Sequence, residues 1–174
     1  MDLSPVSRES MRPPAPLRLY ISSFIIAFLL NLLPWSGVGL LVRPDFVLLI
    51  LLYWAVSEPR SVGQGLAFFL GLLMDVADSA LLGQHALMYV VAIFLAQLLR
   101  VRVLQLSLPA QALHIGAILL LAALIGVSLN LSLGRDFAGV LMIVAPLLSA
   151  FMWPAISLVM ALPRLRRGPG QALG

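Results

Sequence analysis

The chain has 174 residues, of which 61% are hydrophobic and 10% are charged, whereas a soluble domain carries about 25% charged residues. This balance excludes a soluble globular protein, because too little polar surface would remain to cover the core. The formal net charge is +4, every basic residue is arginine, and no basic cluster carries interleaved aromatic residues, which excludes a nucleic-acid partner. Cysteine is absent, so disulfides, thiolate nucleophiles and cysteine metal sites are excluded.

Six uncharged stretches follow one another along the chain, and they predict an all-α membrane protein with six transmembrane helices. They cover residues 19–42, 46–57, 61–74, 81–99, 103–134 and 137–163. A helix needs roughly 20 residues to cross the hydrocarbon layer of a bilayer. The second and third stretches are shorter, and a helix of about a dozen residues rises only ~18 Å. These two stretches either use their flanking charged residues near the interfaces or form a re-entrant hairpin.

The arginines decide between these two topologies. With six crossings and both termini in the cytoplasm, nine arginines fall inside and two outside, which is the expected bias. The inside arginines are Arg8, Arg12, Arg18, Arg60, Arg100, Arg102, Arg164, Arg166 and Arg167, and the outside arginines are Arg43 and Arg135. A re-entrant hairpin would leave Glu58 and Arg60 in the hydrocarbon, where a charge is costly. We therefore expect a cytoplasmic tail over 1–16, one six-helix transmembrane domain over 17–163 and a basic cytoplasmic tail over 164–174.

Asp75 and Asp78 are the carboxylate pair near a predicted span, and their spacing places them on one helix face. Metal-binding and diphosphate-binding enzymes use such pairs, but they also need a second acidic cluster, which the sequence lacks. His85 and His114 fall near opposite membrane faces in this topology, which argues against a shared metal. The sequence thus predicts no catalytic, metal or cofactor site, and it places the two aspartates at the membrane interface.

Small residues recur every four positions in the third stretch, at Gly63, Ala67 and Gly71, and Asp75 is next in the series. Such a ridge lets another helix approach closely. Ala122, Gly126 and Asn130 form a second ridge in the fifth stretch. We expect the two ridges to pack against each other within the protein, although either could serve a partner helix. A shielded Asp75 needs a hydrogen-bond donor, and Arg43 or Arg135 lies on the same predicted side.

The tripeptide Arg43-Pro44-Asp45 precedes the second stretch. Proline fixes its own φ and disfavours helix at the residue before it, so the helix should start here. Asp45 then lies in the first turn, where a negative charge is favourable. Arg43 and Asp45 could pair with each other, or they could meet a partner on the outer face.

Residues 43–54, with the sequence RPDFVLLILLYW, closely resemble the second-span signature of the MreD family of bacterial rod-shape-determining membrane proteins. Weaker supporting positions lie in the other spans: Leu33-Pro34-Trp35, the segment 65–75, Leu82-Gly83 and Trp153-Pro154. The resemblance covers nearly the whole chain, but the fourth and fifth stretches match only in hydropathy, so nothing is carried over to them.

The resemblance implies a non-catalytic subunit of the cell-elongation complex in the bacterial inner membrane. Such a subunit binds MreC and helps to couple MreB filaments to the peptidoglycan synthases. The family is also similar in fold to the six-helix substrate-binding subunits of energy-coupling-factor transporters, so a small-molecule-binding transporter subunit is the alternative function. Those subunits carry an Ala-x-x-x-Ala docking pattern, whereas residues 27–31 read AFLLN. The sequence leaves open which helix face binds the partner, the stoichiometry of the complex, and whether a lipid or small molecule occupies the bundle.

Overall fold

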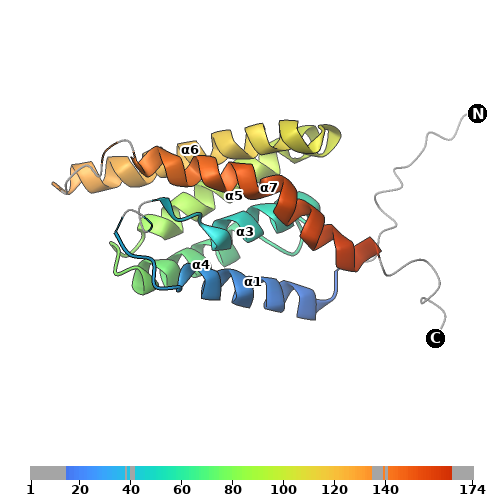
Figure 1. Ribbon diagram of the computed structural model, residues 1–174, viewed down its shortest axis with the longest axis horizontal. Helices are drawn as coiled ribbons and strands as arrows, with labels where there is room; N and C mark the ends of the chain where they lie inside the picture. Colours follow the sequence, from blue (N-terminus) through green and yellow to red (C-terminus); the bar gives the residue numbers. More distant parts are fainter. Residues whose placement is uncertain (1–14, 38, 40–41, 135–138, 140, 166–174) are drawn as a thin grey trace, which may run out of the picture.

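The protein is described by a computed structural model that places residues 15–37, 39, 42–134, 139 and 141–165. These residues form an all-helical bundle, numbered as in Figure 1. The helices are α1 (Leu17–Asn31), α3 (Phe46–Ser57), α4 (Gln64–Ala77), α5 (Gln84–Gln105), α6 (Leu108–Ser132) and α7 (Leu141–Leu165). The all-helical prediction is therefore confirmed for the described part of the chain. Most of both predicted tails lies outside the described residues, including Arg8, Arg12, Arg166 and Arg167. Arg135, between α6 and α7, also lies outside them.

The helices run alternately up and down, with α3 and α5 at the centre (Figure 1). Helix α3 packs against α1, α5 and α7, while α5 also packs against α4 and α6. Helices α6 and α7 pack together on one side of this central pair, and α1 and α4 lie on the other side. Helix α1 starts, and helix α7 ends, at the same end of the bundle (Figure 1).

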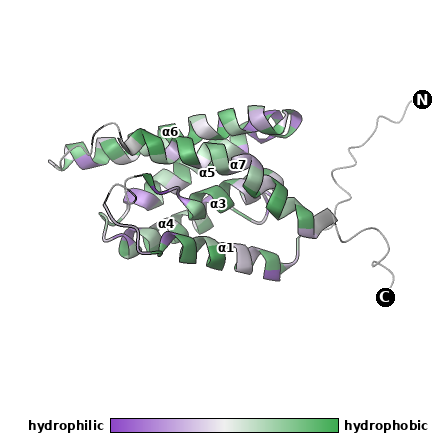
Figure 2. Ribbon diagram, in the orientation of Figure 1, coloured by the Kyte–Doolittle hydropathy of each residue, from purple (hydrophilic) through white to green (hydrophobic). Residues whose placement is uncertain are grey.

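Hydrophilic residues gather toward the two ends of the bundle, and apolar residues fill the length between them (Figure 2). We call one end the Asp45 end, where α1, α4 and α6 finish and α3, α5 and α7 begin. The opposite end, where α3 finishes, is the Glu58 end. Polar side chains at both ends of the bundle form hydrogen bonds to α3. Both ends of this short helix are therefore fixed in position.

Helix α3 is central because its sequence has no polar face. All residues from Val47 to Val56 are buried, and such a uniformly apolar helix is stable only when neighbours surround it. At the Glu58 end, the Arg100 Nε atom donates to the carbonyl oxygen of Val56 at 2.7 Å. Gln97 donates to the carbonyl oxygen of Val62 at 2.8 Å. Helix α5 thus satisfies backbone groups that the end of α3 and the following turn leave without helical partners.

The turn after α3 lies level with the start of α1. The Glu58 carboxylate accepts a hydrogen bond from the backbone N–H of Ala15 at 3.0 Å, and it also accepts one from the hydroxyl of Tyr20. One turn before Glu58 in α3, Trp54 Nε1 donates to Ser23 Oγ at 3.0 Å. Helix α3 therefore packs against the first turns of α1 at this end of the bundle.

Three helices have the length and composition to cross a membrane: Gln84–Gln105, Leu108–Ser132 and Ile143–Pro163. The helices Leu17–Asn31, Phe46–Ser57 and Gln64–Ala77 are apolar but shorter. The two largest errors in the predicted boundaries concern α1 and α5. Helix α1 ends at Asn31, whereas the first stretch was expected to form one helix up to residue 42; Pro34, three residues later, disfavours continuation of the helix. Arg100 and Arg102 lie inside α5, which continues to Gln105, whereas the sequence analysis ended the fourth stretch before them. The error at α5 is understandable because an arginine near a helix end can extend its charged group to the interface.

Candidate functional site

The Asp45 end holds a cluster of polar side chains from four helices, α1, α4, α5 and α7, and from the segment before α3. Asp45 is the N-cap of α3 and has an extended backbone, and its Oδ1 atom accepts from the Leu48 backbone N–H at 3.0 Å. Proline at position 44 is buried directly before it. The sequence placed Asp45 inside the first turn, but a carboxylate at the N-cap bonds the free N–H groups directly. Helix α3 accordingly begins at Phe46.

Asp45 also connects α3 to three other helices. Its Oδ1 atom accepts from Asn31 Nδ2 at 3.2 Å, and its Oδ2 atom accepts from the Tyr89 hydroxyl at 2.6 Å. The Asp45 backbone N–H donates to Ser149 Oγ at 3.3 Å. These contacts reach the end of α1, the second turn of α5 and the third turn of α7, so one carboxylate and its amide hold four helices together.

Asn31 completes the start of α3, and the sequence analysis did not identify it. Its side chain is buried, and its Oδ1 atom accepts from the Phe46 backbone N–H at 3.1 Å. Its amide nitrogen also lies 3.6 Å from the Met74 sulfur. The signal in the sequence is a single amide at the end of an otherwise apolar run, and such a residue needs partners when it is buried.

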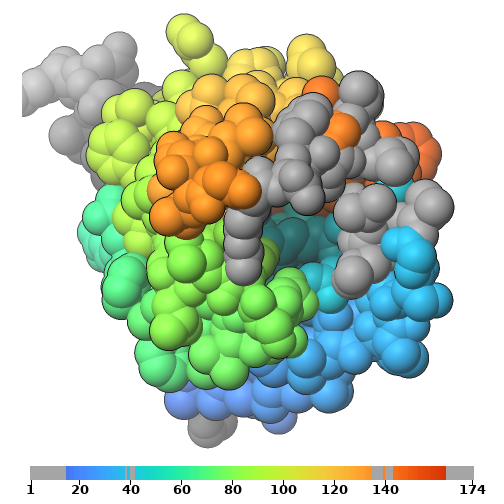
Figure 3. Space-filling view, turned by 90° about the vertical axis from the view of Figure 1, so that its left-hand side faces the viewer, coloured from blue at the N-terminus to red at the C-terminus, as the bar shows by residue number. Residues whose placement is uncertain are grey.

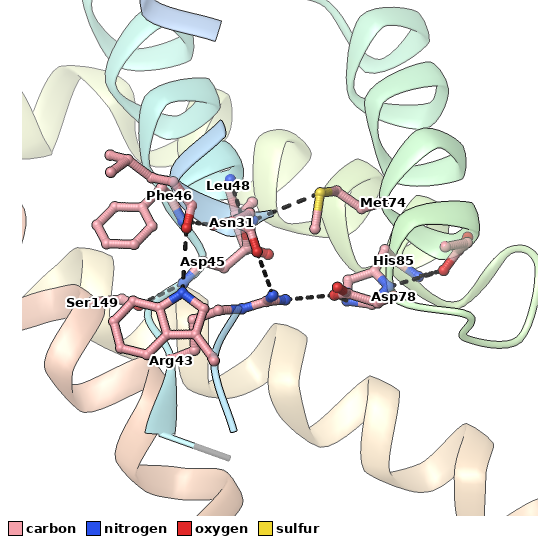
Figure 4. A network of polar contacts seen from close by, with 12 residues as sticks. Asn31, Arg43, Asp45, Phe46, Leu48, Met74, Asp78, His85 and Ser149 are labelled. Atoms are coloured by element: carbon pink, nitrogen blue, oxygen red, sulfur yellow. Dashed lines mark hydrogen bonds and ion pairs between the residues drawn. The ribbon is translucent and has the colours of Figure 1, made fainter. Parts of the chain in front are cut away.

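Arg43 joins the end of α1 to the end of α4 (Figure 4). One guanidinium nitrogen donates to the backbone carbonyl of Asn31 and another to Asp78 Oδ2, each at 2.6 Å. The expected pairs of Arg43 with Asp45 or Asp75 were therefore wrong. A helix C-terminus presents unpaired carbonyl oxygens, so the arginine bonds the end of α1 and a carboxylate at the same time.

Asp75 is buried and bonds to the start of α5. Its two carboxylate oxygens accept from the backbone N–H groups of Gly83 and His85, each at 2.7 Å, and Oδ1 lies 2.9 Å from His85 Nδ1. Gly83 is the N-cap of α5 with φ of 97°, a left-handed conformation that glycine adopts without strain. Because glycine has no capping side chain, the carboxylate of a neighbouring helix supplies the cap.

His85 lies between the two aspartates of α4. Its Nδ1 atom contacts Asp75, and its Nε2 atom is 3.8 Å from Asp78 Oδ2. His114 is elsewhere, in α6, where its Nδ1 atom lies 2.9 Å from the carbonyl oxygen of Ala110 in the same helix. Asp75 and Asp78 thus belong to a connected polar network, rather than to a simple wetted interface.

The α4 ridge contacts α5. Ala67 and Gly71 are buried, and a Cβ atom on Gly71 would lie 2.4 Å from the Cα atom of Ala86. Gly63 lies outside this contact, because it is the N-cap of α4 and a Cβ atom there would meet nothing within 4 Å. The close approach at Gly71 brings Asp75, one turn later, within reach of the first N–H groups of α5.

The α6 ridge also contacts α5, and the expected packing of the two ridges on each other was wrong. A Cβ atom on Gly126 would lie 2.7 Å from the Met88 sulfur, and Ala122 is buried one turn before it. Helix α5 separates α4 from α6, with close contacts on both sides. A four-residue spacing identifies a helix face, but it contains no information about the neighbour.

Trp153 and Pro154 lie in the middle of α7, away from the cluster. Trp153 is buried, and its Nε1 atom donates to Gln111 Oε1 of α6 at 3.3 Å. Helix α7 continues through Pro146, Pro154 and Pro163, each of which removes one backbone hydrogen bond. Trp153 therefore joins α7 to α6.

The cluster at the Asp45 end is built for internal bonding. Within the described ranges, no group of three or more histidine, aspartate or glutamate side chains is placed to hold a metal ion. The carboxylates of Asp45, Asp75 and Asp78 all accept from protein donors. Figure 3 looks onto this end and shows a hollow near its middle, with a floor in the teal colour of α3. The hydrogen bonds of the cluster hold the helix ends in position around that hollow.

Substituting Arg43 with alanine should lower the abundance of the protein in the membrane. The change removes two short hydrogen bonds and leaves the Asn31 carbonyl without its donor, a loss of about 1–3 kcal/mol for a buried group. Asp78→Asn is the matched control, because Arg43 keeps the Asn31 contact and the Asp78 side chain keeps its shape. Quantitative immunoblotting of membranes measures both. Unchanged abundance of Arg43→Ala, together with reduced recovery of a partner protein, would contradict this structural role.

The helices and the cluster together define a class: an all-helical membrane protein whose charged side chains bond the ends of neighbouring helices at both ends of the bundle. Comparison with known proteins gives the family. The family model described as rod shape-determining protein MreD matches residues 11–162, so the chain belongs to the MreD family, and the resemblance carried by residues 43–54 is confirmed.

A curated relative agrees with this assignment. The chain is 31% identical over 140 residues to the rod shape-determining protein MreD of Haemophilus influenzae, and the match covers 80% of this chain and 86% of that protein. No solved structure matches the chain significantly.

Proposed function

We propose that this protein is a non-catalytic subunit of the cell-elongation complex, which binds MreC and helps to couple MreB filaments to peptidoglycan synthesis. Membership of a rod-shape-determining family over residues 11–162 carries the proposal. The arrangement of the bundle supports it, because the carboxylates of Asp45, Asp75 and Asp78 bond to donors within the protein and the outer helix faces expose large apolar side chains. Helix faces are then the main surface available for a membrane partner.

We further propose that all six helices cross the bacterial inner membrane, with both termini in the cytoplasm. Arg18, Arg60, Arg100 and Arg102 lie at the Glu58 end, and Arg43 lies at the Asp45 end. Loops rich in arginine remain in the cytoplasm, which assigns the Glu58 end to that side. The shorter helices α1, α3 and α4 would cross with their polar ends at the interfaces.

Cysteine labelling should test this orientation directly. The chain has no native cysteine, so each introduced cysteine is unique. Ser36 and Ser132 are exposed at the Asp45 end, and Ser61 and Ser107 are exposed at the Glu58 end. An impermeant thiol reagent added to intact spheroplasts should label the first pair and should reach the second pair only after lysis. Labelling of Ser61→Cys or Ser107→Cys before lysis would contradict the proposed topology.

The function is tested by replacement in a rod-shaped bacterium that lacks its own MreD protein. Cells that express this chain together with its cognate MreC should recover rod shape, and affinity-tagged protein should recover MreC from detergent extracts. Membranes in which the chain is abundant but the cells stay round, with no MreC recovered, would contradict the proposal. Recovery of a transporter ATPase pair in place of MreC would instead favour the small-molecule-binding alternative.

A further inference from the structure

The outer helices of the bundle differ strongly in length. Helix α4 has 14 residues, whereas α6 and α7 have 25 residues each. At the helical rise of 1.5 Å per residue, these lengths correspond to about 21 Å and about 37 Å. The hydrocarbon layer of a bilayer is about 30 Å thick. One side of the bundle is therefore shorter than an ordinary bilayer, and the opposite side is longer.

Helix α4, on the short side of the bundle, has an apolar face that points away from the other helices. Helix α4 packs closely on α5, and its other face exposes Phe68, Phe69, Leu73 and Val76, at 50%, 58%, 39% and 68% of their surface. The exposed polar residue of this helix is Gln64, at its first position. The outward face beyond Gln64 offers only carbon to a neighbour, so acyl chains can cover it without any hydrogen bond being lost.

Polar groups limit this apolar face at both ends. Arg60, Ser61 and Gln64 are exposed before and at the start of α4, and Ser79 is exposed just after its end. Leu81 and Leu82 are also exposed, in the turn that leads to α5. These two leucines lie in a turn and not in a continuation of the helix, so α4 itself contributes about 21 Å of helix, less than the hydrocarbon layer of about 30 Å.

The long side carries exposed apolar residues along its whole length. On α6 they include Leu113 near the first turn, Leu124 in the middle and Leu131 in the last turn. Helix α7 adds Phe151, with 83% of its surface exposed, and Leu158. Figure 1 shows α6 and α7 extending past the ends of α1 and α4.

We propose that the α4 face is covered by the acyl chains of a locally thinned bilayer, and that it selects lipids with shorter chains than the α6 face does. A short apolar helix is accommodated by thinning of the surrounding bilayer, at a free-energy cost that rises with each ångström of mismatch. Short-chain lipids lower that cost at α4, and they raise it at α6. The protein therefore imposes different hydrocarbon thicknesses on its two sides, whether or not it binds MreC.

Lipid competition at two matched positions tests the proposal. Phe69→Cys on α4 and Leu124→Cys on α6 replace side chains of nearly equal exposure, 58% and 57%, in a chain without other cysteines. Each full-length variant is labelled with bimane and reconstituted in mixtures of dimyristoleoyl, dioleoyl and dierucoyl phosphatidylcholine. In each mixture one lipid is brominated, and quenching of bimane reports the relative binding of that lipid at the labelled face.

The label at position 69 should prefer the short-chain lipid over the long-chain lipid by about threefold, and the label at position 124 should show no such preference. Val76→Cys provides a second probe on α4 if Phe69→Cys does not fold. The same chain-length preference at both helices would overturn the proposal. Absence of quenching at α4 by any brominated lipid would overturn it as well, because a protein neighbour would then cover the face.

Discussion

Replacing Gly71 with alanine is expected to lower the stability of the folded bundle, although the change adds only one methyl group. A Cβ atom at this position would lie 2.4 Å from Ala86 Cα, 2.6 Å from Ala86 N and 2.8 Å from His85 C. All three are backbone atoms of α5, so no side-chain rotation can relieve the contact. Overpacking of this kind costs about 1–3 kcal/mol, and here it would also move Asp75 away from the first N–H groups of α5.

Gly65 provides the matched control in the same helix. A Cβ atom there would meet nothing within 4 Å. Gly65 lies in the first turn of α4, where glycine to alanine gains at most the helix-interior value of about 1 kcal/mol. Gly65→Ala should therefore unfold at the same temperature as the parent protein or above it. The midpoint of thermal unfolding in detergent micelles measures both variants. If Gly71→Ala were as stable as Gly65→Ala, the close approach of α4 and α5 would be refuted.

The Gly71 contact shows what a spacing pattern can predict. The repeat of small residues identified the α4 face that approaches a neighbour, because only small side chains allow backbones so close. The repeat also included Gly63, which is exposed at the N-cap, and the wrong neighbour was expected. A helix face is a local property of the sequence, whereas the order of helices in the bundle depends on how all the faces pack together.

The polar cluster shows a different limit. Asp45 was identified because proline and aspartate before an apolar run form a local signal for a helix start. Its partners Asn31 and Tyr89 lie 14 and 44 residues away in the chain. Each is an isolated polar residue within an apolar helix, and no local pattern relates one to the other. Only the three-dimensional packing of α1, α3 and α5 brings them to the same carboxylate.

Helix boundaries near arginine show a third limit. The sequence analysis treated Arg100 and Arg102 as a break, but α5 continues through both residues. Arg100 donates to the carbonyl oxygen of Val56, so its charged group contacts the end of a neighbouring helix. Hydropathy alone treats such a residue as a loop signal, although its long side chain can reach a polar partner from within a helix.

Substituting Asp45 with alanine is expected to have the largest effect at the Asp45 end. The change removes the N-cap of α3, which contributes about 0.5–2 kcal/mol. It also leaves the buried Tyr89 hydroxyl without its acceptor and removes the carboxylate acceptor of Asn31 Nδ2, each at a cost of about 1–3 kcal/mol. Asp45→Asn keeps one side-chain oxygen for the Leu48 N–H and should lose less stability. Unfolding midpoints in mixed micelles should therefore fall in the order parent, Asp45→Asn, Asp45→Ala.

A double-mutant cycle with Tyr89→Phe separates the side-chain contact from the helix cap. Tyr89 donates to Asp45 Oδ2, whereas the cap uses Oδ1, so removal of the hydroxyl affects one oxygen alone. Once Asp45 is alanine, the Tyr89 hydroxyl has lost this acceptor, and its removal should cost little or even restore stability. The two substitutions should thus be coupled by about 1 kcal/mol or more. Strictly additive losses would mean that Tyr89 and Asp45 act independently, and that the carboxylate does not join α5 to the start of α3.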